Sequence, residues 1–358
     1  MSGPRLRSFW LFAALLAACE HSAPFRPGAY GSEQPLTPGA IARLTLSSGE
    51  DVLPAWLPGG AGIVYSAERR DRADRDRCLA FLPPTGGRIT RYACRTTASD
   101  DSLNVFYEAA PGTDGRIAYL RASNDPLVAN LSPDTHEFVV GPSNNPNDAR
   151  VLHRLPVTAP WGRAYDALSH IAWVGSDRLV ALGERVRYPR LCMFCPRDTV
   201  RTGVEIIMED IAGAVPVLSL VEGTDNASSV AADATGDTIY FTRNGESRVY
   251  RRILSSRQTD TIYDFSPAGI ARDVTVSKGR LAAVVGGAVS DSVDPFLGEL
   301  QSDHGGPLYL VTSVTGAAFR IGDPALRFRR PAFSPDGTRI VVAAWDTAAA
   351  DIWLFQQP

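Results

Sequence analysis

The segment that decides the fold lies near the C-terminus and reads RPAFSPDGTRIVVA, from Arg330 to Ala343. Two apolar runs flank the tetrapeptide Ser334–Gly337. Its proline fixes φ at about −65°, and its glycine accepts a positive φ, so the chain turns tightly there. The segment therefore predicts a β-hairpin, and repetition of it along the chain would predict a repeat architecture.

The same order of strand, turn and strand recurs through the sequence. A clear copy near the start reads LPAWLPGGAGIVYS, from Leu53 to Ser66. Weaker copies lie between the two, at residues 110–119, 172–180, 232–241 and 276–283. The first core residue after each turn is aliphatic, and these residues are Ile63, Ile117, Leu179, Ile239, Leu281 and Ile340. Six units of about four short strands each predict a six-bladed β-propeller.

The two ends of the repeat region complement each other. The last unit offers three strands, at residues 331–333, 340–344 and 351–355. The run Ile41–Leu46 could supply the missing fourth strand. Pairing of the first and last strands would close the ring and remove its open edges. We therefore expect an all-β, six-bladed propeller over residues 40–358, closed by its N-terminal and C-terminal strands.

The first and last units resemble the repeats of TolB-type propellers. The resemblance is carried by Pro54–Gly60 (PAWLPGG) and Pro331–Gly337 (PAFSPDG), with Arg43–Thr45 just before the first unit. TolB has an N-terminal α/β domain and is soluble, and this sequence predicts neither property. We interpret the chain as similar to the TolB propeller and not as TolB itself. By analogy with TolB, which docks a lipoprotein and other partners, the resemblance implies a docking role.

The N-terminal residues predict export and anchoring. Arg5 and Arg7 precede the apolar run Phe9–Ala18. As a helix, this run would span roughly 15 Å, about half of a hydrocarbon core, so residues 1–18 predict a signal peptide and not a membrane span. The sequence Leu16–Cys19 (LAAC) resembles the lipobox of bacterial lipoproteins. The resemblance implies cleavage before Cys19 and lipidation of its thiol.

Residues 19–39 are rich in Pro, Gly and Ser and show no apolar period, so they predict a flexible tether. Glu20 follows the cysteine. In the enterobacterial sorting pattern an aspartate at this position retains lipoproteins at the inner membrane, so the resemblance favours the outer membrane. The expected location is extracytoplasmic, with the protein lipid-anchored on the periplasmic side or at the cell surface.

Four further cysteines suit an oxidising compartment. Cys78 and Cys94 flank a pattern of strand, turn and strand, so they should face each other across one hairpin and form a disulfide. Cys192 and Cys195 form CMFC in a segment with no helix to lower a thiol pKa and no second pair of zinc ligands. We interpret this pair as a small loop-closing disulfide, with a redox or metal role left open.

The composition narrows the classes of function. The formal net charge is −3, and the densest charge run, Glu68–Arg77, nearly neutralises itself, so no nucleic-acid partner is expected. The sequence has no nucleophile elbow G-x-S-x-G, and Lys278 stands in no Ser-x-x-Lys motif. We therefore expect no catalytic set, no metal and no cofactor, and a monomeric binding protein more readily than an enzyme.

Propellers usually act through the mouth of the central channel. Alignment of the units places five residues near one mouth: Tyr107, His170, Ser229, Asp273 and Arg330. This set could bind a peptide, a sugar or a metal ion, or its members could simply hydrogen-bond to one another. His170 taken alone is interpreted as a structural histidine.

Three aromatic residues recur at one position of the repeat, namely Trp56, Trp173 and Phe333. We interpret them as core between blades and not as a stacking platform. Taken together, the sequence predicts a membrane-tethered scaffold that binds an envelope protein or peptide. A propeller hydrolase or lyase, and a binder of glycans or small ligands at the channel mouth, are the alternatives.

Overall fold

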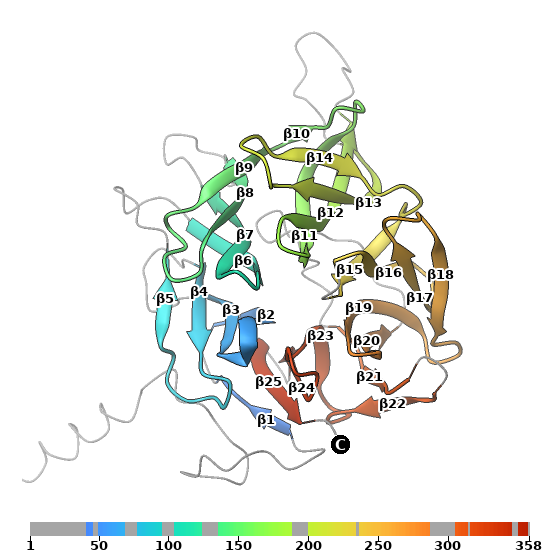
Figure 1. Ribbon diagram of the computed structural model, residues 1–358. Helices are drawn as coiled ribbons and strands as arrows, with labels where there is room; N and C mark the ends of the chain where they lie inside the picture. The colour runs from blue at the N-terminus through green and yellow to red at the C-terminus, as the bar shows by residue number, and fades with distance from the viewer. Residues whose placement is uncertain are drawn as a thin grey trace, which may run out of the picture.

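The computed structural model describes residues 41–45, 49–68, 77–94, 104–123, 135–187, 200–233, 236–286, 305–313, 316–345 and 350–356. Apart from the 3-10 turn Pro58–Gly60, their regular structure is entirely β. The sheets stand around a central axis and form a six-bladed propeller (Figure 1), so the predicted fold class is confirmed. The predicted signal peptide, Cys19, the tether and the pair Cys192 and Cys195 lie outside the described residues.

Within each blade the strands follow one another from the channel outward. Blade 1 contains β2 (Asp51–Trp56), β3 (Ile63–Glu68), β4 (Arg77–Leu82) and β5 (Arg91–Ala93). Blade 2 contains β6 (Asn104–Pro111), β7 (Arg116–Ser123), β8 (Thr135–Pro142) and β9 (Arg150–Leu155). Blade 3 contains β11 (Ala164–Val174), β12 (Arg178–Arg187), β13 (Val200–Asp210) and β14 (Val217–Leu220), and the short β10 (Val157–Thr158) pairs with β11.

The other three blades follow the same plan. Blade 4 contains β15 (Ala227–Ala232), β16 (Thr238–Arg243), β17 (Arg248–Ile253) and β18 (Thr259–Asp264). Blade 5 contains β19 (Ile270–Ser277), β20 (Arg280–Gly286), β21 (Leu308–Val311) and β22 (Ala318–Ile321). Blade 6 contains β23 (Arg327–Phe333), β24 (Arg339–Trp345), β25 (Ala350–Gln356) and, from the other end of the chain, β1 (Ile41–Arg43). No helix among the described residues is long and apolar enough to cross a bilayer.

The core lies between blades and centres on the second strand of each one. The six aliphatic residues predicted to follow the turns are each the first or second residue of such a strand and are at most 1% exposed. In β20 and β24 five consecutive residues are buried, because neighbouring blades cover both faces of the strand. This two-sided burial explains why the strands read as continuous apolar runs.

The ring closes as the sequence predicts. Strand β1 pairs antiparallel with β25, with Ile41 opposite Phe355 and Arg43 opposite Trp353. The closing strand is also held by side chains, since Arg43 forms an ion pair with the buried carboxylate of Asp351. The hydroxyl of Thr45 donates to Asp351 Oδ1 at 3.0 Å and accepts the N–H of Ile352 at 2.9 Å.

Two tryptophans join neighbouring blades in the same way. The indole N–H of Trp56 donates to the carbonyl of Ala332 at 3.0 Å, and that of Trp173 donates to the carbonyl of Ala110 at 2.7 Å. An arginine from the neighbouring blade lies over each indole, Arg339 over Trp56 and Arg116 over Trp173. The interpretation of these aromatics as contacts between blades is therefore supported.

The predicted disulfide between Cys78 and Cys94 is present. It joins the ends of β4 and β5, where Leu79 pairs with Ala93 in the adjacent position of the ladder. The bond thus fixes the outer hairpin of blade 1.

Candidate functional site

The innermost strand of every blade breaks register at an equivalent point along the channel. A further break in β11, between Tyr165 and Ala167, is not part of this set. In β2, β6, β11 and β23 two residues stand opposite one residue of the next strand, and in β15 and β19 one residue has no counterpart. We call the first residue of each irregularity a bulge residue. The bulge residues are Leu53, Glu108, His170, Ser228, Asp273 and Arg330.

Five of the six bulge residues have a positive φ, from 28° at Asp273 to 56° at Leu53 and Glu108. A residue with a β-carbon pays about 1–3 kcal/mol for such a conformation, which persists only where the surrounding structure enforces it. Bulges also re-aim side chains and often lie next to functional sites. The same strained position, repeated around one channel, therefore marks the channel as the candidate site.

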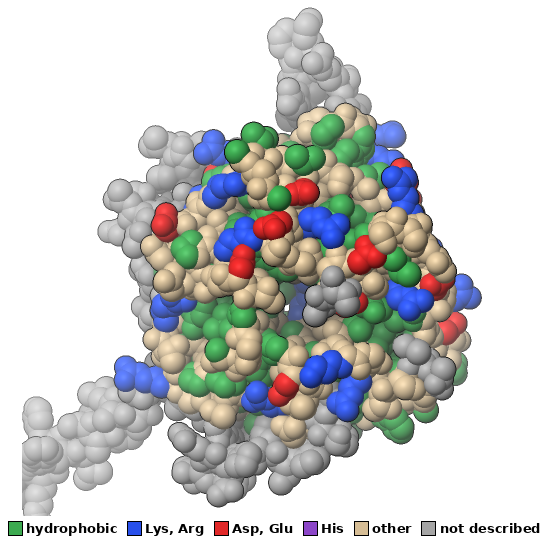
Figure 2. Space-filling view, in the orientation of Figure 1, with side chains coloured by type: hydrophobic (Ala, Val, Ile, Leu, Met, Phe, Trp, Pro, Cys, Tyr) green, Lys and Arg blue, Asp and Glu red, His purple; other side chains and the backbone are tan. Residues whose placement is uncertain are grey.

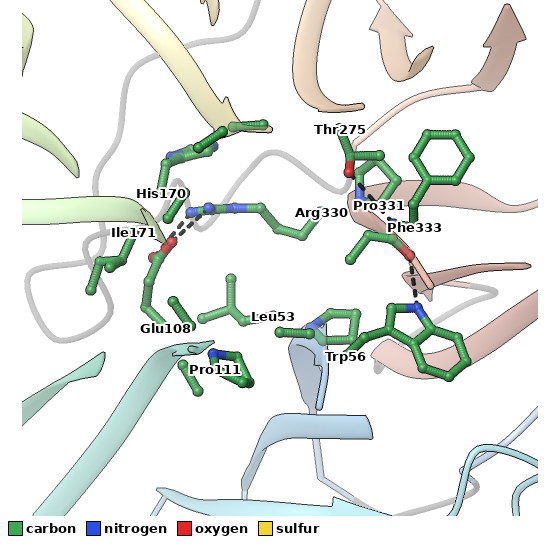
Figure 3. A pocket seen from close by; sticks show the side chains of 18 of the residues that line it. Leu53, Trp56, Glu108, Pro111, His170, Ile171, Thr275, Arg330, Pro331 and Phe333 are labelled. Atoms are coloured by element: carbon green, nitrogen blue, oxygen red, sulfur yellow. Dashed lines mark hydrogen bonds and ion pairs between the residues drawn. The ribbon is translucent and has the colours of Figure 1, made fainter. Parts of the chain in front are cut away.

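The charged bulge residues meet in the channel and bind one another. Arg330 donates to both carboxylate oxygens of Glu108, at 2.7 and 3.2 Å (Figure 3). Asp273 accepts from Arg329 Nε at Oδ2 and from the backbone N–H of Arg330 at 3.0 Å. His170 Nε2 lies 3.1 Å from Asp273 Oδ1. We call these five residues the charged cluster; its two guanidiniums face two carboxylates, so their formal charges cancel.

Burial and neighbouring charges set the protonation of this cluster. Burial lowers the pKa of His170 to about 3, helped by the positive charge of Arg330, so the imidazole is neutral at physiological pH. Burial alone would raise the pKa of Asp273, but the charge of Arg329 and the hydrogen bond from His170 hold it well below its usual range. Asp273 is thus a carboxylate that only accepts hydrogen bonds.

A cavity of about 290 Å³ lies on one side of the charged cluster. We call it the apolar cavity because most of its lining residues have apolar side chains, although backbone groups and the charged cluster also expose polar atoms to it. Its walls come from residues that follow the bulge residues along the inner strands, mostly alanine and proline, such as Ala55. Figure 3 shows Pro111 and Pro331 among them. Trp56, Trp173 and Phe333 complete the lining. Figure 2 shows one face of the ring, with a hollow near its centre and apolar side chains beside it.

A second cavity, of about 470 Å³, lies on the other side of the cluster, next to blades 3 and 4. We call it the polar cavity because most of its lining residues are polar or charged, although Leu168, Leu182 and Val204 also line it. Residues that precede or form the bulges line it, and His170 and Arg330 border both cavities. Its polar lining residues are Ser169, Glu184, Arg201, Thr202, Asn226, Ser228, Asn244 and Arg329. The charged cluster therefore lies between the apolar cavity and the polar cavity.

The structure brings together three of the five predicted site residues, namely His170, Asp273 and Arg330. It does not place Tyr107 or Ser229 with them. Tyr107 is buried and its hydroxyl lies 3.2 Å from His136 Nδ1. Ser229 is fully buried, bonded to Thr242 at 2.7 Å and to the N–H of Val274. In both blades the bulge residue is the sequence neighbour of the selected residue, Glu108 next to Tyr107 and Ser228 next to Ser229.

The sequence analysis did not select Glu108 or Leu53. A signal for both exists in the sequence, because an alanine lies two residues after the bulge residue in four blades. These alanines are Ala55, Ala110, Ala172 and Ala332. Alignment on them would have selected Glu108 in place of Tyr107. Among the described residues, no group of three or more His, Cys, Asp or Glu side chains is arranged to hold a metal ion.

No protein-family model matches the sequence, and no curated protein matches it either. Solved structures do match. The gluconolactonase XC5397 of Xanthomonas campestris has a TM-score of 0.56 at 11% identity, with 95% of this chain and 96% of that chain covered. The propeller domain of Cps50 (Swd1) from Myceliophteria thermophila has a TM-score of 0.52 at 10% identity, with 89% and 100% covered.

TolB from Acinetobacter baumannii has a TM-score of 0.51 at 14% identity over 84% of this chain. The match spans 65% of the length of the TolB chain. Identities this low show the fold and nothing finer. The chain is thus a six-bladed β-propeller similar in fold to TolB and to propellers of other functions.

Proposed function

We propose that this protein is a lipid-tethered propeller of the cell envelope that binds a peptide, or a protruding segment of a partner protein, in the apolar cavity. The observation that carries the proposal is the cavity itself, in which apolar walls stand over a floor of strained and charge-balanced side chains. Apolar walls with a few fixed polar groups are the usual composition of a ligand pocket.

The size of the cavity limits the ligand. At about 290 Å³ it lies at the lower end of the range for ligand pockets, roughly 300–1,000 Å³. It can take the side chains of a short segment but not a folded domain. A protein partner would therefore insert an exposed apolar segment and rest its remaining surface on the rim.

The floor of the cavity limits the charge of that segment. A ligand with a single charge would have to separate Arg330 from Glu108, and the loss of this nearly buried ion pair is costly. An uncharged segment avoids this cost, and its amide groups can still meet the guanidinium and the carboxylate. We therefore expect an apolar, uncharged stretch of polypeptide at the point of contact.

Several observations support the envelope location. The N-terminal pattern around Cys19 resembles that of bacterial lipoproteins. The disulfide between Cys78 and Cys94 suits an oxidising compartment. Mass spectrometry of the mature protein tests the anchor, since a diacylated N-terminal Cys19 is expected and a Cys19→Ser variant should lose it and leave the membrane fraction.

Photo-cross-linking in living cells tests the binding function. A photoreactive amino acid replaces Ala55 in the cavity wall, and a matched control replaces Thr261, which is exposed on the outer strand of blade 4. We expect a discrete protein adduct from position 55 only, reduced when Ala110→Leu narrows the cavity. Equal adducts from both positions, or none from position 55, would contradict the proposal. Stabilisation by glycans in the absence of an adduct would favour the small-ligand alternative.

A further inference from the structure

A serine, a histidine and an aspartate form a hydrogen-bonded series at the edge of the polar cavity. Ser169 Oγ lies 3.3 Å from His170 Nδ1, and His170 Nε2 lies 3.1 Å from Asp273 Oδ1. Ser169 and His170 line the polar cavity, whereas Asp273 is buried, with 3% of its surface exposed, and borders the apolar cavity instead. This is the order of groups that an activated serine requires: nucleophile, base and orienting carboxylate.

The hydrogen-bond partners fix the tautomer of the histidine. Asp273 is a carboxylate and can only accept, so Nε2 of His170 carries the hydrogen that it receives. The lone pair of the neutral ring then sits on Nδ1, facing the hydroxyl of Ser169. The serine can donate to this nitrogen and pass it a proton. The 3.3 Å separation is long, as is common for catalytic hydrogen bonds without substrate.

The backbone conformation also indicates a role beyond packing. His170 has a φ of 53° and Asp273 a φ of 28°, although neither is glycine. These two strained residues come from blades 3 and 5, and their side chains meet in the channel. Strain of this kind is concentrated at catalytic and ligand-binding positions, where it holds side chains in a required geometry.

We propose that Ser169, His170 and Asp273 act as nucleophile, general base and orienting carboxylate in the hydrolysis of small, polar carboxylic esters in the polar cavity. The volume of about 470 Å³ limits the substrate to a small molecule. Its lining of arginine, asparagine and threonine suits a polar one. The activity would lie on the opposite side of the charged cluster from the peptide-binding cavity and does not depend on the function proposed there.

The reaction has two balanced steps. In the first, Ser169 Oγ bonds to the ester carbonyl carbon, the bond to the alkoxy oxygen breaks, and the serine proton passes through His170 Nδ1 to the departing alcohol. In the second, water attacks the acyl-serine, gives its proton to Nδ1 and releases the acid, and the proton returns to Ser169. Arg201 and Asn226 line the same cavity and carry N–H donors of the kind that stabilise the negative charge on the carbonyl oxygen. Before substrate binds, Arg201 pairs with Glu184 at 2.9 Å and Asn226 donates to the carbonyl of Asn244 at 3.3 Å.

We expect slow turnover. The burial that lowers the pKa of His170 to about 3 makes the imidazole a weak base, so proton removal from Ser169 is only weakly driven. Activated esters, in which the leaving group departs easily, should therefore be the best substrates. The rate should stay constant across neutral pH, because His170 does not titrate there.

The test uses the purified protein, a fluorophosphonate probe and p-nitrophenyl acetate. We expect one phosphonyl group on Ser169, found by peptide mapping. Ser169→Ala should abolish the adduct and lower ester hydrolysis by about 100-fold, and His170→Gln should slow labelling at least about tenfold. Ser219→Ala is the matched control, because Ser219 lies on the outer strand β14 and donates to the carbonyl of Met208 and not to an imidazole.

Three outcomes would overturn the proposal. The first is that folded wild-type protein shows no adduct on Ser169. The second is that Ser169 is labelled equally fast in His170→Gln. The third is that Ser169 is labelled but the protein does not hydrolyse the ester. Circular dichroism checks that each variant folds. If His170→Gln does not fold, the labelling site in the wild type and the hydrolysis rate of Ser169→Ala still test the proposal. Ser169→Ala removes a single oxygen atom, so it should fold.

Discussion

Arg330 of blade 6 binds Glu108 of blade 2 through two hydrogen bonds across the channel, although 222 residues separate them in sequence. Both side chains are nearly buried, at 12% and 6% exposure. Blade 1 lies between the two blades, so this contact ties the ring together in addition to the packing of neighbouring blades. It also fixes two bulge residues in one relative position, which defines the floor of the apolar cavity.

Removal of one partner of this pair should be strongly destabilising. Glu108→Ala leaves a buried guanidinium without its carboxylate and should lower the free energy of unfolding by about 3 kcal/mol. Urea denaturation measures the loss. The control is Glu222→Ala, which breaks the exposed pair of Glu222 and Arg257 and should leave the midpoint unchanged within error. Equal losses in the two variants would show that the pair of Arg330 and Glu108 stabilises the fold no more than an exposed ion pair does.

The stability of the fold should decrease with acid, partly because of His170. Its pKa is about 3 in the folded protein and about 6.5 when unfolded. The unfolded state therefore binds the proton first, and stability falls as the pH drops below about 6.5, by at most about 1.4 kcal/mol per pH unit from this residue. The contribution of Asp273 is lost only at lower pH, below the range of ordinary carboxylates.

His170→Gln isolates the histidine's share of this effect. Unfolding free energies of wild type and variant, measured between pH 7 and pH 5, should converge as the pH falls, because only the wild type loses the contribution of a buried neutral imidazole. Parallel curves for the two proteins would mean that His170 is protonated equally in the folded and unfolded states.

Loss of the disulfide between Cys78 and Cys94 should weaken the fold measurably. The bond joins residues separated by 16 positions, and closure of a loop of this size stabilises a fold by roughly 3 kcal/mol. The double variant Cys78→Ala/Cys94→Ala should show this loss in urea denaturation. A reducing agent should cause a loss of at least this size in the wild type. Any loss that it causes in the double variant would come from the disulfide predicted between Cys192 and Cys195.

The two tryptophans between blades provide an internal comparison. Trp173→Phe removes the indole hydrogen bond to the carbonyl of Ala110, and Trp56→Phe removes the equivalent bond to Ala332. Each change should cost about 1–2 kcal/mol, since a largely buried carbonyl loses its partner. Thermal or urea unfolding of both variants should give similar losses. A large difference would show that the two hydrogen bonds, although alike in geometry, contribute unequally to the free energy of unfolding.

The fold could be predicted from the sequence because its determinants are local. The turn Ser334–Gly337 and the aliphatic residue after each turn define hairpins within about 15 residues, as sequence patterns of this type do. Closure by β1 followed from the absence of a fourth strand in the last unit. The disulfide followed from the symmetry of Cys78 and Cys94 about one turn.

The candidate site could be predicted only in part, because a bulge adds one residue to a strand and the types of the neighbouring residues do not reveal where. In blade 4 the neighbours Ser228 and Ser229 are chemically identical, so only the break in register between Ala227 and Ser229 identifies the bulge residue. In blade 2 the prediction selected Tyr107, one residue before the break. The contact of Arg330 with Glu108 depends on the curvature of the whole ring, which no local pattern contains.

The closing strand β1 has a mechanical consequence. Residues 1–40 join the propeller at Ile41, so tension applied through them reaches the ladder between β1 and β25 before any other part of the fold. This ladder is short, with paired positions only from Ile41 to Arg43, and it is reinforced by Asp351 through Arg43 and Thr45. When force is applied to the N-terminus, β1 should separate from β25 first, and blade 6 would then expose β25 as an unpaired edge strand.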